Sequence, residues 1–402
     1  MTTAAKTMST TPVTVQPDRK LIQEVTECGG DFKKCYQCAT CASVCTLSGE
    51  NGDFPRRQML LAQWGLKDEL MGDPGPWLCF YCGECSKMCP RKAHPGESMM
   101  AMRRYLTAQY DWTGLARLMY RSAWMEIGVL LLVAAFVVTL FTVPQNFGFG
   151  LLRHSAPEAR SVVMLDKFAP VMTVHHGDAI MAAILSFFLL TNAARMFFAL
   201  TQGRGIPIGT YFTELPGLIV QGLTQARWRN CKDPDATRNW IRHLFLVTGY
   251  GTIFTLIVLF LPWFQVADNS FRWTSILGYY STAVLVITTS WILLDRVTKQ
   301  TEMHRFSHLS DWLFPILLLL TAITGIAVHI LRLSNLAMPT YYMYTAHMAI
   351  AVPMLVVEVP FGKWAHLLYR PLAIYVDAVR KRTLEVPSQQ AVAAGVTGEA
   401  KA

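Results

Sequence analysis

The chain has 402 residues, a formal net charge of +9, and 52% hydrophobic against only 16% charged residues. Soluble proteins carry about 25% charged residues, and the mean hydropathy here is positive at +0.29, so an ordinary soluble protein is excluded. The basic excess does not indicate nucleic-acid binding, because Arg and Lys cluster beside apolar stretches, as they do along one side of a membrane protein.

Two cysteine runs dominate the N-terminal part. Residues 1–20 are expected to form a flexible tail, because they are rich in Thr and Ala and show no periodicity. Residues 21–112 contain the spacing Cys-x2-Cys-x2-Cys-x3-Cys twice, the first run ending at Cys45 and the second at Cys89. In bacterial ferredoxins with this spacing, three cysteines of a run bind one [4Fe–4S] cluster and the fourth binds the other cluster.

The spacing therefore predicts two [4Fe–4S] clusters with exchanged fourth ligands. The ligands of one cluster are expected to be Cys35, Cys38, Cys41 and Cys89. Those of the other are expected to be Cys79, Cys82, Cys85 and Cys45.

Zinc and disulfides are the alternatives for these cysteines. A zinc site takes pairs of ligands and gives no reason for four evenly stepped cysteines in one short loop. Disulfides require an exported chain, and the N-terminus shows no apolar stretch preceded by positive charge. We expect reduced thiols in a cytoplasmic, ferredoxin-like domain, which is helical because the spacer 54–66 has helical apolar spacing.

Six apolar stretches follow, each long enough for a helix to cross a hydrocarbon core of about 30 Å, which takes about 20 residues. They are expected near 122–143, 172–199, 243–264, 274–294, 312–333 and 342–366, the last broken by Pro353 and Pro360. The predicted fold class is mainly α, with a six-helix membrane domain over 113–370 and a cytoplasmic tail over 371–402.

Basic residues predict how the chain is oriented. They concentrate before the first stretch and after the second, fourth and sixth, whereas the opposite loops carry fewer. Because loops rich in Arg and Lys remain on the cytoplasmic side, we expect a multi-pass protein of the inner (cytoplasmic) membrane. Both termini and the cluster domain are then cytoplasmic.

Histidines lie at matched depths near the ends of these stretches. His243 and His366 are expected at the cytoplasmic side, where they would bind one b-type haem from two facing helices. His347 would bind a second, outer haem together with His175 or His176, or with His329 in their place. His347 and His366 are 19 residues apart in the sequence, or about 28 Å along a helix. The alternative for each histidine is a hydrogen bond to backbone or lipid headgroup.

Two carboxylates are weaker candidates for chemistry. Glu358 lies within the sixth stretch, and Asp178 follows the His175–His176 pair. Ionisable groups in membrane spans are costly and mark functional sites. Each is a candidate for proton exchange with a quinone or, alternatively, for pairing with a neighbouring polar group.

This order of features resembles the QmoC family, the membrane subunits of the quinone-interacting oxidoreductases of sulfate reducers. The soluble part looks like the small iron–sulfur subunit of heterodisulfide reductase. The membrane part is similar to the cytochrome b subunits of respiratory nitrate reductase and of membrane-bound heterodisulfide reductase, a likeness carried by residues 240–243 and 360–366. Unlike the nitrate reductase type, this chain has no second histidine deeper in its third stretch.

The resemblance implies a membrane subunit that exchanges electrons with menaquinol through two b haems, or at least one. The electrons would continue through two [4Fe–4S] clusters to soluble flavin- and iron–sulfur-containing partners of the QmoA/QmoB type, toward adenylylsulfate reductase. The sequence has no Gly-x-Gly-x-x-Gly after a strand, so no flavin site is expected in this chain.

Two other functions compete with this one. The first is the membrane subunit of a heterodisulfide-reductase-like or related quinone-linked dehydrogenase. The second belongs to a different class and is a haem-free membrane anchor or docking module. Haem content separates this anchor from both redox hypotheses, and partner identity separates the two redox hypotheses from each other.

Overall fold

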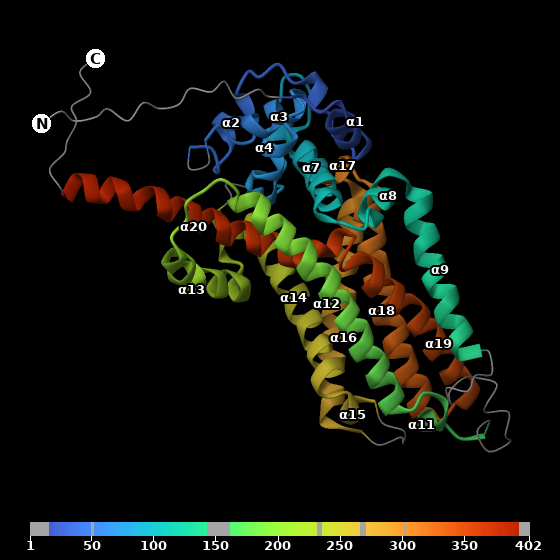
Figure 1. The fold of residues 1–402 in the computed structure, drawn as a ribbon. Coiled ribbons are helices and arrows are strands. Elements are labelled where there is room, and N and C mark those ends of the chain that lie inside the picture. Colours follow the sequence, from blue (N-terminus) through green and yellow to red (C-terminus); the bar gives the residue numbers. More distant parts are fainter. Residues whose placement is uncertain are drawn as a thin grey trace, which may run out of the picture.

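The computed structural model describes residues 16–49, 52–142, 161–230, 235–265, 271–300 and 302–393. Within these ranges every regular element is a helix, and the one extended pairing is an isolated bridge between Gly49 and Gly52. The predicted mainly α fold class is confirmed. Figure 1 shows a group of short helices seated on one end of a bundle of long ones.

Short helices surround the cysteine runs in the N-terminal region. They are α1 (Arg19–Glu27), η1 (Phe32–Lys34), α2 (Thr40–Val44), α3 (Arg56–Gln63), α4 (Lys67–Met71), α5 (Gly75–Leu78), α6 (Glu84–Lys87) and α7 (Pro95–Tyr110). Asp18 caps α1, since its carboxylate accepts a 2.8 Å hydrogen bond from the backbone N–H of Lys20. The longest helix, α7, is almost wholly buried and forms the centre of this region.

Six helices are long and apolar enough to cross a membrane within the described residues, which fits a multi-pass membrane protein. Their bounds are α9 (Ala123–Thr142), α12 (Val171–Thr201), α14 (Ala236–Leu259), α16 (Trp273–Thr298), α18 (Leu309–Leu333) and α19 (Ala337–Pro353) with the π-helical turn η4 (Met354–Glu358). Each predicted stretch overlaps one of these helices, so the predicted six-helix bundle is confirmed.

The remaining helices lie at the two ends of the bundle. At the end near the N-terminal region are α8 (Leu115–Arg121), α13 (Ile208–Thr224), η3 (Ala226–Asn230), α17 (Glu302–Arg305), η5 (Lys363–Ala365) and α20 (His366–Ala393). At the far end are α11 (Leu165–Phe168) and α15 (Leu261–Phe264).

The sixth span ends earlier than the sequence predicts. It stops at Glu358, and His366, expected at its end, is instead the first residue of α20. Pro360 and Gly362 interrupt the helix between them, because proline lacks the backbone N–H that a continuing helix needs. The predicted tail over 371–402 is helical as far as Ala393, and residues 394–402, like 1–15, lie outside the described part.

Helix α13 was not anticipated, because the loop after the second span was interpreted only from its basic residues. Its exposed apolar residues recur at helical spacing, at Ile208, Phe212, Leu215, Ile219 and Leu223. This is the pattern of an amphipathic helix with one apolar face.

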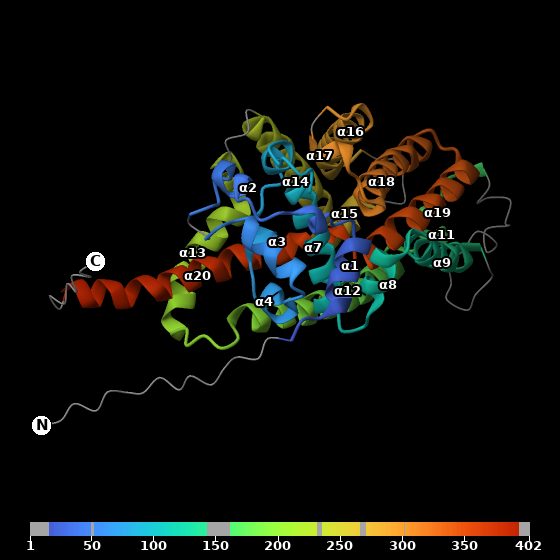
Figure 2. The same cartoon turned by 90° about the horizontal axis from the view of Figure 1, so that it is seen from above.

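The N-terminal region packs firmly onto the bundle. Seen from above, α20 passes beneath the N-terminal helices (Figure 2). The buried ring of Tyr369 on α20 makes edge contacts with Trp77 and Tyr110, at centroid distances of 5.3 and 5.9 Å. Arg104 on α7 forms a 3.0 Å ion pair with Asp311 at the start of α18. These contacts hold the cysteine runs over one end of the span helices.

Candidate functional site

Both cysteine loops have the same backbone conformation. In the first run Gln37 and Ala39 have φ of 59° and 66°, and at the matching positions of the second run Tyr81 and Gly83 have 58° and 87°. Positive φ is uncommon for residues other than glycine. Its recurrence at matched positions indicates a loop shape that turns successive cysteine side chains toward one point.

Backbone N–H groups point at the thiols in both loops. The amide of Gln37 donates to Sγ of Cys35 at 3.4 Å, and that of Tyr81 donates to Sγ of Cys79 at 3.3 Å. A third amide donates to Cys89 at 3.4 Å. Such hydrogen bonds stabilise negative charge on sulfur and tune the reduction potential of iron–sulfur clusters.

The thiols fall into two groups of four that mix the runs. One small cavity is lined by Cys35, Cys38, Cys41 and Cys89. In the other group the electrostatic neighbours of Cys45 and Cys85 include Cys79 and Cys82. The structure thus brings each fourth cysteine to the three cysteines of the other run.

The environment of the thiols suits a cationic iron core. Burial raises the pKa of Cys41 and of Cys45 to about 11, so each would remain a neutral thiol without a positive partner. Metal binding deprotonates a coordinating thiol outright. Cys38 is exposed, and its hydrogen bond with Thr40 lowers its pKa. Among the described residues, no group of three or more His, Cys, Asp or Glu side chains could hold a single metal ion. This does not conflict with the clusters, because the ligands of a four-iron cluster lie farther apart than those of a single ion.

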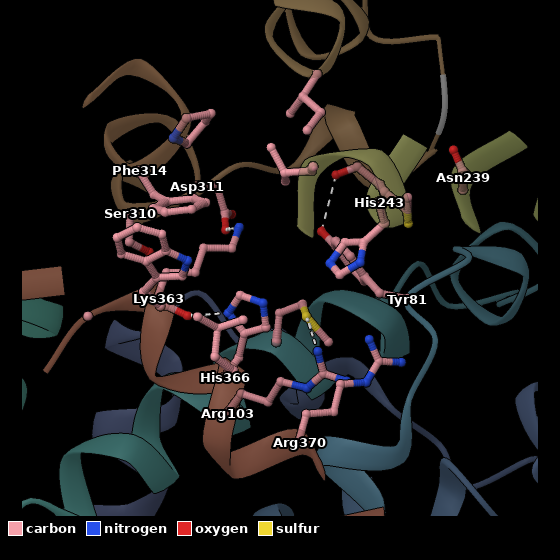
Figure 3. Close-up of a pocket in the computed structure, with 18 of the residues that line it drawn as sticks. Tyr81, Arg103, Asn239, His243, Ser310, Asp311, Phe314, Lys363, His366 and Arg370 are labelled. Carbon is pink, nitrogen blue, oxygen red and sulfur yellow. Dashed lines mark hydrogen bonds and ion pairs between the residues drawn. The ribbon is translucent and has the colours of Figure 1, made fainter. Parts of the chain in front are cut away.

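A second cavity, of about 290 Å³, lies where the N-terminal region meets the bundle. Both His243 of α14 and His366 of α20 line it, and Figure 3 shows their imidazoles facing the same space. The two histidines predicted to share a haem are therefore brought together. They come from different helices, as a six-coordinate haem requires.

Each imidazole has one nitrogen fixed by a hydrogen bond. Nδ1 of His366 donates to the backbone oxygen of Lys363 at 2.6 Å, and Nδ1 of His243 lies 2.5 Å from Oε1 of Gln225. Such bonds set the tautomer and leave Nε2 as the nitrogen for a metal. Burial lowers the pKa of His366 to about 4, so its imidazole is neutral, as ligation needs.

The cavity is strongly basic. Its lining includes one carboxylate, Asp311, and the six basic residues Arg103, Arg104, Arg242, Arg296, Lys363 and Arg370. The Nε atoms of Arg296 and Arg370 are buried without a hydrogen-bond partner in the described part of the chain. A haem carries two propionates, so the residues present fit this group.

The basic cavity adjoins the second group of thiols. Cys82 lines it directly. Arg103 and Arg370 both donate to the backbone oxygen of Cys79, at 2.5 and 3.3 Å. Arg370 lies one helical turn after His366, so a single helix connects the histidine in the cavity with the cysteine loop. Sequence reasoning missed Arg103 and Arg370 as site residues, because the contact joins segments far apart in the chain.

The outer histidines lie toward the far end of the bundle and are less clearly paired. Nδ1 of His347 lies 2.9 Å from the hydroxyl of Thr324, and His329 bonds the hydroxyl of Tyr279 at 2.7 Å. Nδ1 of His175 is buried with no partner among the described residues, whereas His176 is exposed. No contact between His347 and either of these two is found within the described ranges.

The structure places the two candidate carboxylates at opposite ends of the bundle. Asp178 is half-buried one turn after His175 and interacts electrostatically with it. Glu358 is fully buried near the basic cavity and accepts a 3.1 Å hydrogen bond from the backbone N–H of Lys363. A further buried carboxylate, Glu126 of α9, lies beside Glu358. Sequence reasoning missed Glu126, although a single acid in an apolar span was a usable signal.

Comparison with known proteins supports the iron–sulfur interpretation. A family model described as "4Fe-4S dicluster domain" matches residues 31–93. A protein of Archaeoglobus profundus that is similar to the C subunit of heterodisulfide reductase is 36% identical over 101 residues, which are 25% of this chain and 54% of that protein. The C subunit of the H2:CoB-CoM heterodisulfide,ferredoxin reductase of Methanothermobacter thermautotrophicus is 39% identical over 77 residues, or 19% and 41%.

A third relative is the iron–sulfur C subunit of the CoB–CoM heterodisulfide reductase of Methanopyrus kandleri, 33% identical over 69 residues, or 17% of this chain and 36% of that protein. The chain spans about half the length, or less, of these curated relatives. No solved structure matches it. The N-terminal part is therefore a [4Fe–4S] dicluster region similar to the C subunits of heterodisulfide reductases, which are subunits of oxidoreductase complexes.

Proposed function

We propose that the chain is the membrane electron-transfer subunit of a quinone-linked oxidoreductase. It would connect menaquinol with soluble flavin- and iron–sulfur-containing partners through b haems and two [4Fe–4S] clusters. The single observation that carries this proposal is the basic cavity, because His243, His366 and Cys82 all line it. When bound, haem and clusters supply one-electron carriers.

The chain's own residues would bind and tune these groups. His243 and His366 present Nε2 to the cavity, and its buried guanidinium groups would neutralise propionate charge. For an outer haem we propose His347 with His175, because His175 has a buried nitrogen without a partner among the described residues. The two groups of four thiols would hold the clusters, each with one ligand from the other run.

The order of these sites indicates how electrons could move through the chain. The cysteine group of Cys79 and Cys82 adjoins the basic cavity, whereas the group that includes the exposed Cys38 lies farther out. A soluble partner would therefore exchange electrons at the first run. We place this surface and both termini in the cytoplasm, as the distribution of basic residues favours.

Within this function we propose a Qmo-type complex of sulfate respiration, with QmoA/QmoB-like partners acting toward adenylylsulfate reductase. The support is the order of the domains, an iron–sulfur region fused ahead of six spans with layered histidines. A heterodisulfide-reductase-like complex is the second candidate, and the names of the relatives of the N-terminal part favour it. Co-purification of the partner subunits followed by mass spectrometry decides between them.

Haem content tests the proposal. In purified protein we expect a b-type reduced-minus-oxidised spectrum and about eight non-haem irons, two clusters of four. His243→Ala and His366→Ala should each remove one haem and leave the cluster signals in place. His304→Ala, a buried histidine outside the cavity lining, is the matched control and should keep full haem content. A haem-free wild-type protein with intact clusters would instead indicate an anchor or docking module.

A further inference from the structure

Two carboxylic acids are buried together where the first and sixth spans meet. Glu126 lies in the first turn of α9 and is the single ionisable residue of that helix. Glu358 is the last residue of the π-helical turn η4. Their exposed fractions are 2% and 0%, and their carboxyl groups interact electrostatically with each other.

Such a pair has to share a proton. Ionised carboxylates only accept hydrogen bonds, so two neighbouring carboxyl groups can bond to each other only when one of them carries a proton. Oε2 of Glu126 and Oε1 of Glu358 are buried and have no hydrogen-bond partner in the described part of the chain. Two negative charges side by side in an apolar interior repel each other strongly, and the established outcome is one shared proton.

The backbone is shaped around Glu358. Met354–Glu358 form a single π-helical turn, a feature that often occurs at functional sites in helices. A Cβ atom at Gly362 would overlap Oε2 of Glu358, so a glycine is required there. The same oxygen accepts the hydrogen bond from the backbone N–H of Lys363. The carboxyl group is therefore held in place by the polypeptide.

The charges around the pair nearly cancel. The groups that act on it electrostatically are Arg104, Asp311 and Lys363, together with the uncharged phenol of Tyr120. Arg104 and Lys363 both pair with Asp311, which leaves one positive charge. A pair with one proton contributes one negative charge, which offsets that positive charge.

The pair and these neighbours border the basic cavity. Arg104, Asp311, Lys363, Gly362 and Tyr120 all line that cavity as well as surround the pair. An electron that enters the cavity therefore adds a negative charge within one layer of side chains of the two carboxyl groups. A pair that holds one proton has a free protonation site at that distance.

We propose that Glu126 and Glu358 form a redox-linked proton-binding site, in which the pair shares one proton and binds a second when an electron enters the adjacent cavity. This inference rests on the proposed function, in which a quinol supplies the electron. One proton from water converts the singly charged pair into two neutral carboxylic acids. The added electron and the added proton then leave the net charge of the region unchanged.

Redox-induced infrared difference spectroscopy of the purified full-length protein tests this site. On reduction by dithionite we expect a gain in the C=O stretch of a protonated carboxyl group, shifted in D2O. Glu126→Gln and Glu358→Gln should each abolish that gain and remove the proton uptake that accompanies reduction. Asp377→Asn, which alters a carboxylate on α20 that is 15% exposed and pairs with Lys381, should keep both signals.

Two further measurements keep the test decisive. Gly362→Ala retains both acids but displaces Glu358, so it should weaken the signal without removing a carboxyl group. Visible absorbance of the same samples reports haem and clusters and so checks both the fold and the proposed function. If haem is absent, a pH-induced carboxyl signal that is lost in the Gln variants still identifies the pair. A carboxyl signal that persists in both Gln variants, or is missing from wild type, overturns the proposal.

Discussion

At the scale of single residues, the cysteines show what spacing can and cannot determine. The two runs predict two sets of thiols, and the matched positive-φ residues and N–H···S bonds give both loops the same shape. The exchange of the fourth ligand depends on the fold, because Cys89 must reach across to the first run. In the structure Cys89 lines the small cavity with the first three cysteines of that run.

Reciprocal substitutions of the fourth cysteines test this exchange. Cys89→Ser should disturb the cluster of the first run, and Cys45→Ser should disturb that of the second, because each removes a ligand from the opposite loop. Electron paramagnetic resonance of the reduced protein separates the two cluster signals. Cys28→Ser, which changes a buried thiol outside both runs, is the control. The assignment would be contradicted if Cys89→Ser disturbed the cluster of the second run and Cys45→Ser that of the first.

Glu97 gives a prediction for pH dependence. Its carboxylate lies 2.6 and 2.7 Å from the hydroxyl of Tyr81, and burial raises the pKa of Glu97 to about 8. The folded chain therefore keeps a proton that the unfolded chain loses above its ordinary pKa of 4.5. Stability should fall as pH rises between these two values, by at most about 1.4 kcal/mol per pH unit.

Glu97→Gln should flatten this decline, because the amide does not titrate. The measurement is the temperature at which cluster absorbance is lost on heating, compared for wild type and variant at several pH values. An equal slope in both proteins would show that Glu97 does not titrate in this range.

At the scale of elements, helix α20 joins the two parts of the molecule. It begins at the cavity residue His366 and carries Tyr369, whose fully buried ring lies between Trp77 and Tyr110 of the N-terminal region. Farther along, Arg380 donates to the backbone oxygen of Gly72 at 3.0 Å. The position of the cysteine loops over the bundle therefore depends on this helix.

Removing the Tyr369 ring should loosen that connection. Tyr369→Ala leaves a cavity between two aromatic neighbours and should cost about 3 kcal/mol of stability, the range for large aromatic residues in a core. Thermal unfolding in detergent, followed by loss of cluster absorbance, measures the effect. Leu384→Ala on the same helix, where the side chain is 74% exposed, should change nothing. An unaltered transition in Tyr369→Ala would show that α20 does not support the N-terminal region.

The elements also show how far the sequence determines the fold. Hydropathy placed all six spans, since about twenty apolar residues suffice to identify a membrane helix. Hydropathy did not predict where the sixth span ends, because η4 and η5 depend on Pro360, Gly362 and the contacts of Glu358. It also missed α13, whose apolar stripe is too short to stand out beside longer spans. The partners of His243 and Glu358 stayed hidden because Gln225 and Glu126 lie in other segments of the chain.

At the scale of the whole molecule, the sites follow one another from the membrane to the surface. The basic cavity is lined by His243 and His366, the Cys79–Cys82 loop borders it, and the Cys35–Cys41 loop lies beyond. The sequence predicted both sets of candidate ligands, but their adjacency comes from the docking of α7 and α20 at one end of the bundle. Arg370 contributes to this arrangement, because it lines the cavity and donates a hydrogen bond to the backbone oxygen of Cys79.

The most direct test is quinol-driven reduction of the clusters in purified protein, followed by rapid mixing and freeze-quench electron paramagnetic resonance. With a menaquinol analogue, the wild-type protein should reduce b haem first and the clusters next. His366→Ala should keep clusters that dithionite reduces, but the quinol should reduce them at least tenfold more slowly. Cluster reduction by quinol at the wild-type rate in haem-depleted His366→Ala would contradict an electron path through the cavity.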